Sequence, residues 1–318
     1  MMSPTDPAGT VPLVSAAGIV DWGEQQIRLT DTVSVLQGAE NGAYPSGNSV
    51  LVEGAAETIV IDPSVTVVEK GGAPVAVDAV INSHGHEDHM PGNSLFTDAR
   101  VHIHNDDLLA AQSLDGLMDV YGLEGQPRTD FEEQVLEEFS YAARPDAEGF
   151  KEGHVFDLGG GVTVEAMHLP GHTRGHSGLI MDNVFFLSDI DLTGFGPYYG
   201  DAWSDLDQFD ESLRRAREVE AEWYVTFHHK GIIEGRELFL DMIDKFHAVI
   251  ERRHSAMLEY LVEPRSLDEM MLHRFVYRPH VEHVFANSVE HRTAELHVQR
   301  MLDRGEATEV APGKFQRT

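Results

Sequence analysis

The sequence predicts an α/β protein in which two strand-rich halves carry helices on the outside, followed by a small helical domain. Segments with strand-like and helix-like patterns follow one another in blocks along the 318 residues. No apolar run approaches the roughly 18 to 20 residues that a membrane span needs. The side chains best suited to chemistry stand directly after strand-like segments, where open α/β sheets commonly build their sites.

The first half of the chain contains short segments rich in Val, Ile and Thr, which are separated by Gly, Asn and Pro. These features predict strands within 26–36, 49–62, 77–82 and 101–104. Two helical patterns follow, at 106–122 and 130–142.

The second half repeats this order. Strands are predicted at 155–158, 162–168, 179–187 and 223–227. Helices are predicted at 206–221, where apolar residues recur at helical spacing, and at 237–261.

The character of the chain changes near Ile243, which predicts a main domain at 1–242 and a C-terminal domain at 243–318. Ser266 and Glu269 have the spacing of a capping box, which marks a helix start. A further helix is expected at 289–304 and a hairpin at 307–315. This order of helices and a hairpin is typical of a winged-helix domain.

Charge is distributed unevenly along the chain. The net charge is −31, and residues 245–318 hold 11 basic and 11 acidic residues, so the whole excess lies in residues 1–244. An acidic body repels phosphate backbones, which argues against nucleic acid as a partner. The absence of cysteine excludes disulfides and thiolate metal sites. Because residues 1–18 also lack the pattern of a signal peptide, a cytoplasmic location without membrane contact is expected.

The most informative stretch has the sequence HGHEDH at 84–89. It places four metal-capable side chains within six residues: His84, His86, Asp88 and His89. Imidazole nitrogen and carboxylate oxygen are the ligands that zinc, iron and manganese take from proteins without thiolates. A strand-like run precedes the stretch and a turn follows it, so it is expected on a loop at a strand end. The alternative is a chance histidine-rich surface loop.

Three later segments supply what a second set of ligands needs. His172 lies in PGHTRGH at 170–176, Asp189 in LSD at 187–189 and His228 in FHHKG at 227–231. A lone histidine at a strand end is more often a surface or hydrogen-bonded residue. Taken together, and each at a strand exit, the three segments predict a centre with two metals.

In these ordered motifs the chain resembles the metallo-β-lactamase-fold hydrolase superfamily. The resemblance covers roughly residues 26–240, and the first two motifs are its most specific part. It implies an αββα sandwich with a dinuclear metal site between two β-sheets. The C-terminal segment is similar to the winged-helix tail that some members carry.

The resemblance also implies ligand roles, position by position. The first metal would be bound by His84, His86 and His172, the second by Asp88, His89 and His228, and Asp189 with a hydroxide would bridge them. Asp88 would also steer the hydroxide, so Asp88 and Asp189 are the expected catalytic residues. Two zinc ions are the expected cofactor, with iron or manganese as alternatives.

Two ligand assignments leave an alternative open. Asp189 is preferred to Asp191 as the bridging carboxylate because it closely follows the apolar run, although Ser188 stands where the family usually has glycine. His228 is preferred to His229 because it comes first after the strand.

Two further residues are expected to support the ligands rather than bind metal. Asp62 matches a family aspartate that braces the metal loop, although Pro63 and Ser64 stand where the family continues with a small residue and glycine. His176 is the second, as a structural histidine near the ligands.

Aromatic residues are expected to form a substrate pocket beside the metals. Phe195, Tyr198, Tyr199 and Trp203 follow the bridging aspartate, and Tyr44 lies on a loop that would overhang the site. Such walls favour a small apolar or aromatic substrate, and a tyrosine hydroxyl would stabilise an oxyanion. The alternative is that these aromatics are core or dimer contacts.

The sequence therefore predicts a zinc hydrolase of a small molecule: an ester, a lactone or a thioester, or a ring that loses a halide by hydrolysis. One alternative is an iron-dependent redox enzyme similar to persulfide dioxygenases, which share the first motif. The other is a nucleic-acid processing or binding protein, suggested by the tail. Since the charges of the tail balance, it is expected to serve in packing or in a homodimer.

Overall fold

The first half of the chain folds into a seven-stranded sheet in the order β2-β3-β4-β5-β7-β8-β9. The structure is a computed structural model that describes residues 17–281 and 285–318. The strands are β2 (Gln26–Arg28), β3 (Val33–Leu36), β4 (Ser49–Glu53), β5 (Thr58–Ile61), β7 (Ala79–Asn82), β8 (Arg100–His104) and β9 (Glu148–Phe150). The segments predicted at 26–36 and 49–62 each form two antiparallel strands. A short parallel pair, β1 (Gly18–Ile19) and β6 (Gly72–Ala73), lies beside this sheet.

The second half forms a six-stranded sheet in the order β10-β11-β12-β13-β14-β15. Its strands are β10 (Val155–Asp157), β11 (Thr163–His168), β12 (Ser177–Met181), β13 (Val184–Ser188), β14 (Trp223–Thr226) and β15 (Ile232–Glu234). The prediction of one strand at 179–187 was wrong, because the chain turns at Asp182 and Asn183, which have φ of 38° and 62°. Asp and Asn tolerate such positive φ values, and a two-residue hairpin turn requires them.

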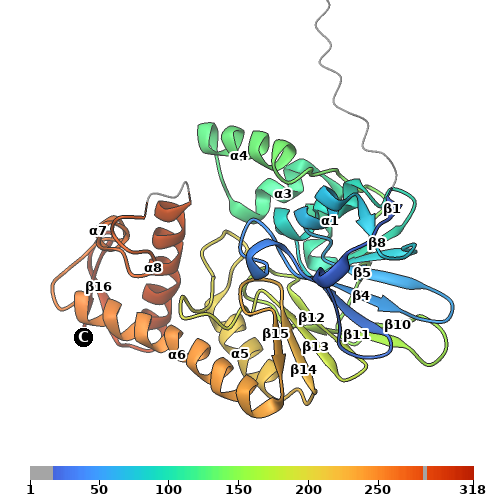
Figure 1. Cartoon of the computed structure of the whole chain (residues 1–318). Helices are drawn as coiled ribbons and strands as arrows, with labels where there is room; N and C mark the ends of the chain where they lie inside the picture. The colour runs from blue at the N-terminus through green and yellow to red at the C-terminus, as the bar shows by residue number, and fades with distance from the viewer. Residues whose placement is uncertain (1–16, 282–284) are drawn as a thin grey trace, which may run out of the picture.

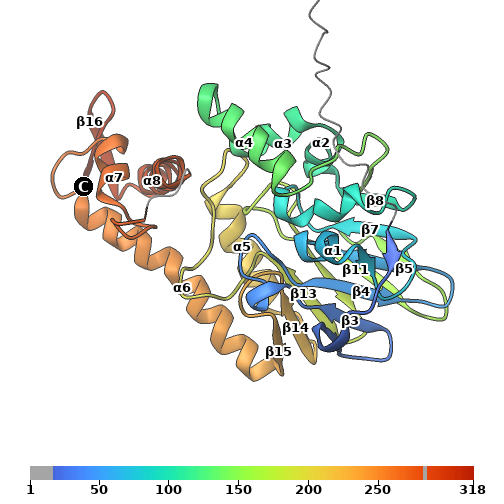
Figure 2. The ribbon, with the colours of Figure 1, turned by 45° about the horizontal axis from the view of Figure 1, so that its top comes forward.

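The two sheets pack face to face with helices on both outer faces, which confirms the predicted α/β sandwich of αββα type (Figures 1 and 2). Neighbouring residues of a strand point to opposite faces. Val50 and Val52 therefore lie in the core between the sheets, whereas Leu51 packs under the outer helices. The first sheet is covered by α1 (Val65–Lys70), α2 (Leu108–Gln112), α3 (Leu114–Tyr121) and α4 (Gly125–Glu137), the second by α5 (Leu206–Arg217) and α6 (Arg236–Tyr260).

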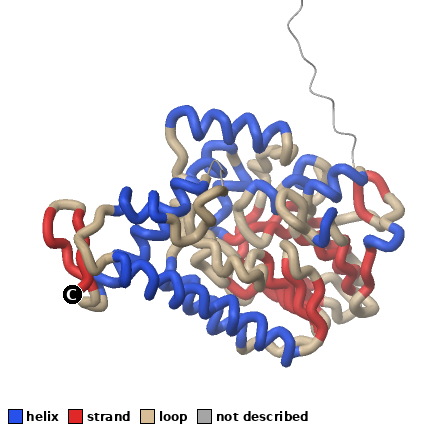
Figure 3. Tube along the Cα trace, turned by 60° about the vertical axis from the view of Figure 1, so that its left-hand side comes forward, coloured by secondary structure: helices blue, strands red, loops and turns tan. Residues whose placement is uncertain are grey.

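The C-terminal segment forms a small unit around the end of α6. Figure 3 shows α6 as a long helix that runs from the second sheet to the C-terminal hairpin. The other elements are α7 (Leu267–His273), α8 (Ala286–Asp303), β16 (Ala307–Ala311) and β17 (Lys314–Arg317). The capping box of Ser266 and Glu269 is confirmed. Because α6 passes through residue 243 without a break, the boundary between 1–242 and 243–318 stays a prediction, as does the winged-helix character.

Parallel pairing brings the functional loops to one edge. β5, β7 and β8 run parallel in the first sheet, and β13 and β14 run parallel in the second. Their carboxyl ends therefore open at a common edge of the sandwich. Five short 3-10 helices lie in the described loops: η1 (Gly23–Gln25), η2 (Ala39–Asn41), η3 (Glu87–His89), η4 (Pro91–Ser94) and η5 (Asn105–Asp107).

The structure tests the expectation about membrane spans but not the expectation about a signal peptide. Of the helices in 17–281 and 285–318, none is both long and apolar enough to cross a bilayer. The expectation that the N-terminus is no signal peptide falls almost entirely on residues 1–16, which lie outside the described part of the chain.

Candidate metal centre

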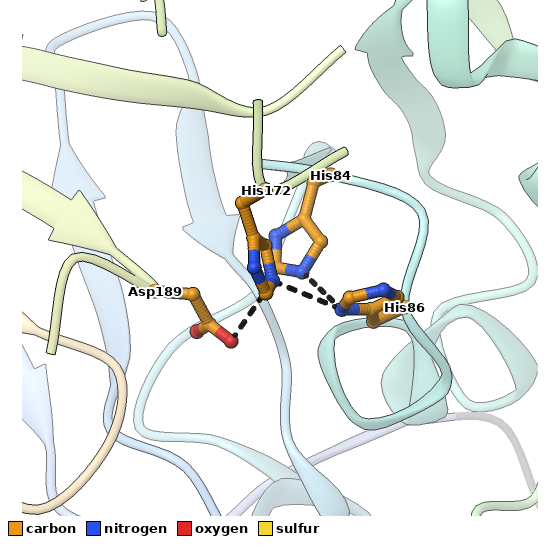
Figure 4. A group of neighbouring side chains, drawn as sticks. All are labelled: His84, His86, His172 and Asp189. Atoms are coloured by element: carbon orange, nitrogen blue, oxygen red, sulfur yellow. Dashed lines mark hydrogen bonds and ion pairs between the residues drawn. The ribbon is translucent and has the colours of Figure 1, made fainter. Parts of the chain in front are cut away.

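All seven predicted ligands come together at the common edge of the two sheets. Those of the HGHEDH stretch follow β7, and His172, Asp189 and His228 follow β11, β13 and β14. Their donor atoms form two groups that could each hold an ion. The first group is His84, His86, His172 and Asp189 (Figure 4), and the second is Asp88, His89 and His228.

The first group has the spacing of a metal-binding site. His84 Nε2 lies 3.0 Å from His86 Nδ1, and His172 Nε2 lies 3.1 Å from the same atom. Asp189 Oδ2 lies 3.3 Å from His172 Nε2. Ligands held tetrahedrally at about 2.0 to 2.1 Å from a zinc ion are roughly 3.3 Å apart. All four donor atoms lie within 4.8 Å of one another, so this group could hold one cation.

The second group adjoins the first through Asp189. His228 Nε2 lies 2.8 Å from Asp88 Oδ2, and His89 Nε2 lies 3.0 Å from Asp189 Oδ1 and 3.8 Å from Asp88 Oδ1. One oxygen of Asp189 thus faces the first group and the other faces the second. This is the position that a carboxylate shared by two cations requires.

Each of the five imidazoles has a protein group next to its other ring nitrogen, and in four of them the two are within hydrogen-bonding geometry. His89 Nδ1 donates to Asp62 Oδ2 at 2.8 Å, His172 Nδ1 to the Tyr198 carbonyl at 2.9 Å, and His228 Nδ1 to the Gly42 carbonyl at 2.8 Å. In the remaining two, His84 Nδ1 lies 3.1 Å from Ser83 Oγ, and His86 Nε2 lies 3.1 Å from Asp201 Oδ2. Such partners fix the ring orientation and leave one nitrogen of each ring for a metal.

The unsatisfied atoms of the site also fit a cation. Four buried atoms here have no hydrogen-bond partner among the described residues: His89 Nε2 and Asp189 Oδ1, which face each other between the two groups, and His86 Nε2 and Asp201 Oδ2 beside the first. Buried polar atoms are costly unless they are paired or coordinate a metal. The donors are imidazole nitrogens and carboxylate oxygens, which suit zinc, iron or manganese. The residues present therefore fit divalent metal, and the assignment of each residue to a metal stays a prediction.

The pKa shifts of the ligand histidines also agree with a cation site. Burial opposes charge on His89 and His228, but the carboxylates of Asp189 and Asp88 outweigh it and raise both pKa values, that of His228 to about 9. Burial, together with the positive charge of His89, lowers the pKa of His84 well below its usual value. Without a cation, the neighbouring carboxylates therefore favour the protonated forms of His89 and His228. Metal binding would release those protons.

Asp62 and His176 lie where supporting residues were predicted, outside both groups. Asp62 accepts hydrogen bonds from the Ser83 amide at 2.6 Å and the Ser83 hydroxyl at 2.5 Å, in addition to His89 Nδ1. His176 Nδ1 donates to the Leu169 carbonyl at 3.0 Å, and its Nε2 accepts from the Asp189 amide at 3.3 Å. Asp62 thus orients a ligand ring, and His176 orients the backbone of the shared carboxylate.

The two alternative ligands lie outside the metal-capable groups of the described residues. The carboxylate of Asp191 accepts from the Thr193 amide at 3.1 Å, and burial raises its pKa to about 6. His229 lies at the rim of the site with φ of 58° and does not join the second group. The geometry therefore favours Asp189 and His228.

Two positioning residues gave no signal in the sequence. Buried Asp107 accepts hydrogen bonds from the amides of Gly85 at 3.0 Å and Gly175 at 2.7 Å, and from the Thr173 hydroxyl at 2.5 Å. It therefore ties the first metal loop to the loop that carries His172. Asp201, which meets His86, is the second. Both aspartates lie in polar segments without a recognisable motif, so only their contacts in the folded chain show this role.

A cavity of about 390 Å³ opens onto the two groups. Its lining combines metal-site side chains with aromatic rings: Tyr44, His86, Glu87, Asp88, Tyr121, His172, Asp189, Asp191, Thr193, Phe195, Tyr198, Asp201, His228, His229, Tyr277 and Phe285. Tyr44, Phe195 and Tyr198 thus lie where the sequence predicted. Tyr121, Tyr277 and Phe285 were missed, because they come from a distant helix and from the C-terminal segment.

The structure corrects the prediction for two aromatic residues, which pack into the protein instead of lining this cavity. Tyr199 is 1% exposed, and its hydroxyl lies 3.0 Å from His297 Nε2. Trp203 is buried under the guanidinium of Arg174, whose Cζ lies 4.6 Å from the ring centroid. Tyr199 thus packs against α8, and Trp203 belongs to the core cluster that includes Leu117 and Val120 of α3.

Glu87 does not join either metal-capable group, but it lines the cavity. It accepts hydrogen bonds from the hydroxyls of Tyr44 and Tyr121. Burial, with the charge of Asp88, raises the pKa of Glu87 to about 7.

Comparison with known proteins assigns the family. Residues 44–229 match the family described as "Metallo-beta-lactamase superfamily". The chain therefore belongs to this superfamily. Its members are typically metal-dependent hydrolases, although the family also includes other reactions.

Solved structures agree on the fold. A metallo-beta-lactamase family protein from Thermus thermophilus is similar with a TM-score of 0.68 and 18% identity over 92% of this chain and 100% of that one. A beta-lactamase domain protein from Burkholderia ambifaria gives 0.66 and 15% over 92% and 93%. BJP-1, a subclass B3 metallo-beta-lactamase of Bradyrhizobium japonicum, gives 0.53 and 14% over 79% and 98%. A search of curated proteins found no match.

Proposed function

We propose that this protein is a zinc-dependent hydrolase of small apolar or aromatic molecules: esters, lactones or thioesters, with hydrolytic dehalogenation of an activated ring as a related reaction. The observation that carries the proposal is the shared position of Asp189. Its Oδ2 lies 3.3 Å from His172 Nε2 and its Oδ1 lies 3.0 Å from His89 Nε2. A carboxylate so placed joins two binding sites for divalent cations into one centre.

Two bound cations would supply a nucleophile at neutral pH by lowering the pKa of a bound water, and would polarise the substrate oxygen. The protein's own part is to hold the donors in place. His84, His86 and His172 would bind one cation, and Asp88, His89 and His228 the other. Asp88 would also accept a hydrogen bond from the attacking water and so orient it toward the substrate.

The cavity wall supports an apolar or aromatic substrate. Six aromatic side chains line it, and no lysine or arginine does so among the described residues. The hydroxyls of Tyr44 and Tyr121 donate to Glu87, and that of Tyr198 donates to Asp201 at 3.2 Å. Each of these three tyrosines would therefore stabilise an oxyanion only by exchanging its present acceptor. The reacting part of the substrate is proposed to be uncharged.

A small molecule is the proposed partner rather than nucleic acid or a membrane. The residues around the metal groups include Glu87, Asp191 and Asp201, and the net charge of the chain is −31. Phosphate backbones and anionic lipid surfaces are repelled by such a charge.

The test is metal analysis of the purified protein, followed by a hydrolysis panel of lactones, thioesters, aryl esters, phosphodiesters, β-lactams and chlorinated aromatics. We expect two zinc ions per chain and turnover of an ester, lactone or thioester. Folded protein that binds no metal would refute the proposal. Two zinc ions with no turnover of any compound would remove the proposed substrates. Iron together with persulfide oxidation would replace the hydrolase by a redox enzyme.

A further inference from the structure

A second hollow lies directly beside the metal cavity. It is a groove of about 640 Å³ formed by α6, by residues 275–281 and by the loop at Gly194 and Phe195. Phe195 and Tyr277 line both the groove and the cavity, and their ring centroids lie 5.6 Å apart. The two rings therefore form a shared wall, and a molecule that passes them contacts both hollows.

The groove differs from the rest of the protein in charge. Arg252, Arg253, Arg278 and His280 line it, and none of its described lining residues is acidic. The whole chain, in contrast, has 54 acidic and 23 basic residues. The described charged side chains that line the groove are thus all basic, and the carboxylate next to it, that of buried Glu290, is held by the amides of Phe275, Val276 and Tyr277.

One basic side chain of the groove is buried and has a structural role, whereas the other three are exposed to solvent. Buried Arg253 donates to the carbonyls of Pro197 and Phe195, at 2.5 and 2.8 Å, and so fixes the shared wall. Arg252, Arg278 and His280 are exposed. Neither Arg252 nor Arg278 makes an ion pair with a described residue, although most arginines of this acidic chain do. Two guanidinium groups are therefore available to a ligand.

We propose that this groove binds the anionic tail of the substrate whose uncharged reactive group enters the metal cavity. The proposal rests on the hydrolase function above and narrows its substrate class. Guanidinium groups bind carboxylate and phosphate through paired N–H donors, and either anion suits the groove. The part of the substrate between tail and reactive group would be apolar, because it passes Phe195 and Tyr277.

The test uses metal-loaded protein and matched pairs of 4-nitrophenyl esters. One member of each pair is the half-ester of succinic, adipic, suberic or sebacic acid, with a free carboxylate, and the other is its methyl ester. We expect kcat/KM to be higher for the carboxylate than for the methyl ester, with a maximum at one chain length. A second series carries a phosphonate in place of the carboxylate. The anion that the groove prefers is the one with the larger ratio of kcat/KM between the anionic compound and its methyl ester.

Charge variants show whether the preference arises in the groove. R252Q and R278Q together should lower the ratio of carboxylate to methyl ester by about tenfold, which corresponds to about 1.4 kcal/mol. Turnover of the methyl esters should stay within about twofold, since neither arginine lines the metal cavity. R252K keeps the positive charge but loses the paired N–H donors, so it should lower the preference only in part. K245Q removes one positive charge from an exposed site on the same helix and should leave the ratio unchanged.

The outcomes separate this proposal from the hydrolase function. Hydrolysis with a ratio of one or less at every length, or with a ratio that the arginine variants do not alter, overturns the anionic tail and leaves the hydrolase intact. If no ester is hydrolysed, calorimetric titration with the corresponding aryl ketone acid decides. Binding that weakens in the double variant supports the groove without the ester hydrolase. No binding overturns the anionic tail, and the hydrolase function is then decided by the metal analysis and the hydrolysis panel alone.

Discussion

Asp107 provides the most direct test of how the metal loops are positioned. Its carboxylate is fully buried and accepts three hydrogen bonds, from the amides of Gly85 and Gly175 and from the Thr173 hydroxyl. Gly85 lies between the ligands His84 and His86, and Thr173 follows His172. Asp107→Ala removes all three acceptor contacts and leaves the donors in the interior.

The expected loss of stability follows from these contacts. A hydrogen bond to a charged acceptor contributes about 1.5 kcal/mol or more, so three would contribute roughly 4.5 kcal/mol. Burial of the carboxylate opposes this, as the raised pKa of Asp107 shows. We therefore expect the free energy of unfolding to fall by about 3 kcal/mol. Because both metal loops lose their common support, metal affinity should also fall by roughly 10- to 100-fold.

The assay is urea unfolding followed by circular dichroism, with chelator present so that metal does not contribute. Zinc affinity is measured separately by competition with a chromophoric chelator. Asp106→Ala is the matched control, because this neighbouring carboxylate is exposed and should change stability by less than about 0.5 kcal/mol. A loss below about 1 kcal/mol in Asp107→Ala, with zinc affinity unchanged, would refute the positioning role.

Three further predictions follow from the site and from α7. His172→Ala should lower kcat/KM more than about 100-fold and His176→Ala about 10-fold, because only the first would remove a ligand; steady-state kinetics giving equal losses would contradict this. Chelation should lower Tm by roughly 5 °C or more, since metal binds only the folded chain, and calorimetry with and without zinc measures this. The hydrogen bonds from Lys314 and from the Ser266 backbone lower the pKa of Glu269 to about 2, below its usual 4.5. The stability from this shift is present above pH 4.5 and lost as pH falls from 4.5 to 2, so Glu269→Gln should remove this part of the acid destabilisation in urea titrations at each pH; an unchanged pH profile would show that the contacts are absent in solution.

Most elements of the fold were predictable because their signals are local. Alternation of apolar residues indicated the strands, and the spacing of Ser266 and Glu269 indicated a helix start that the structure contains. The breaks within elements were harder. The predicted helix at 106–122 is interrupted at Ser113, whose side chain accepts the Gly116 amide at 3.0 Å and starts α3. A capping serine inside a helical pattern resembles any exposed serine until the chain is folded.

The metal groups were predictable to a similar extent. His84, His86 and His89 stand close together in the sequence, so their proximity needed no fold. Asp189 and His228 come close to these histidines only because β13 and β14 pair in parallel, which brings both residues to the same edge of the sheet. That pairing could not be read from either strand alone.

By itself, the sequence determined which donor types the site contains, that they stand at strand ends, and that the main body is acidic, because composition and strand periodicity are local properties. Only the tertiary structure decided that Asp189 faces both groups, that Asp107 joins the two metal loops, and that Tyr277 shares a wall between cavity and groove. These relations join residues far apart in the chain. They arise from how two sheets and a C-terminal helix pack, and packing depends on all the side chains between them at once.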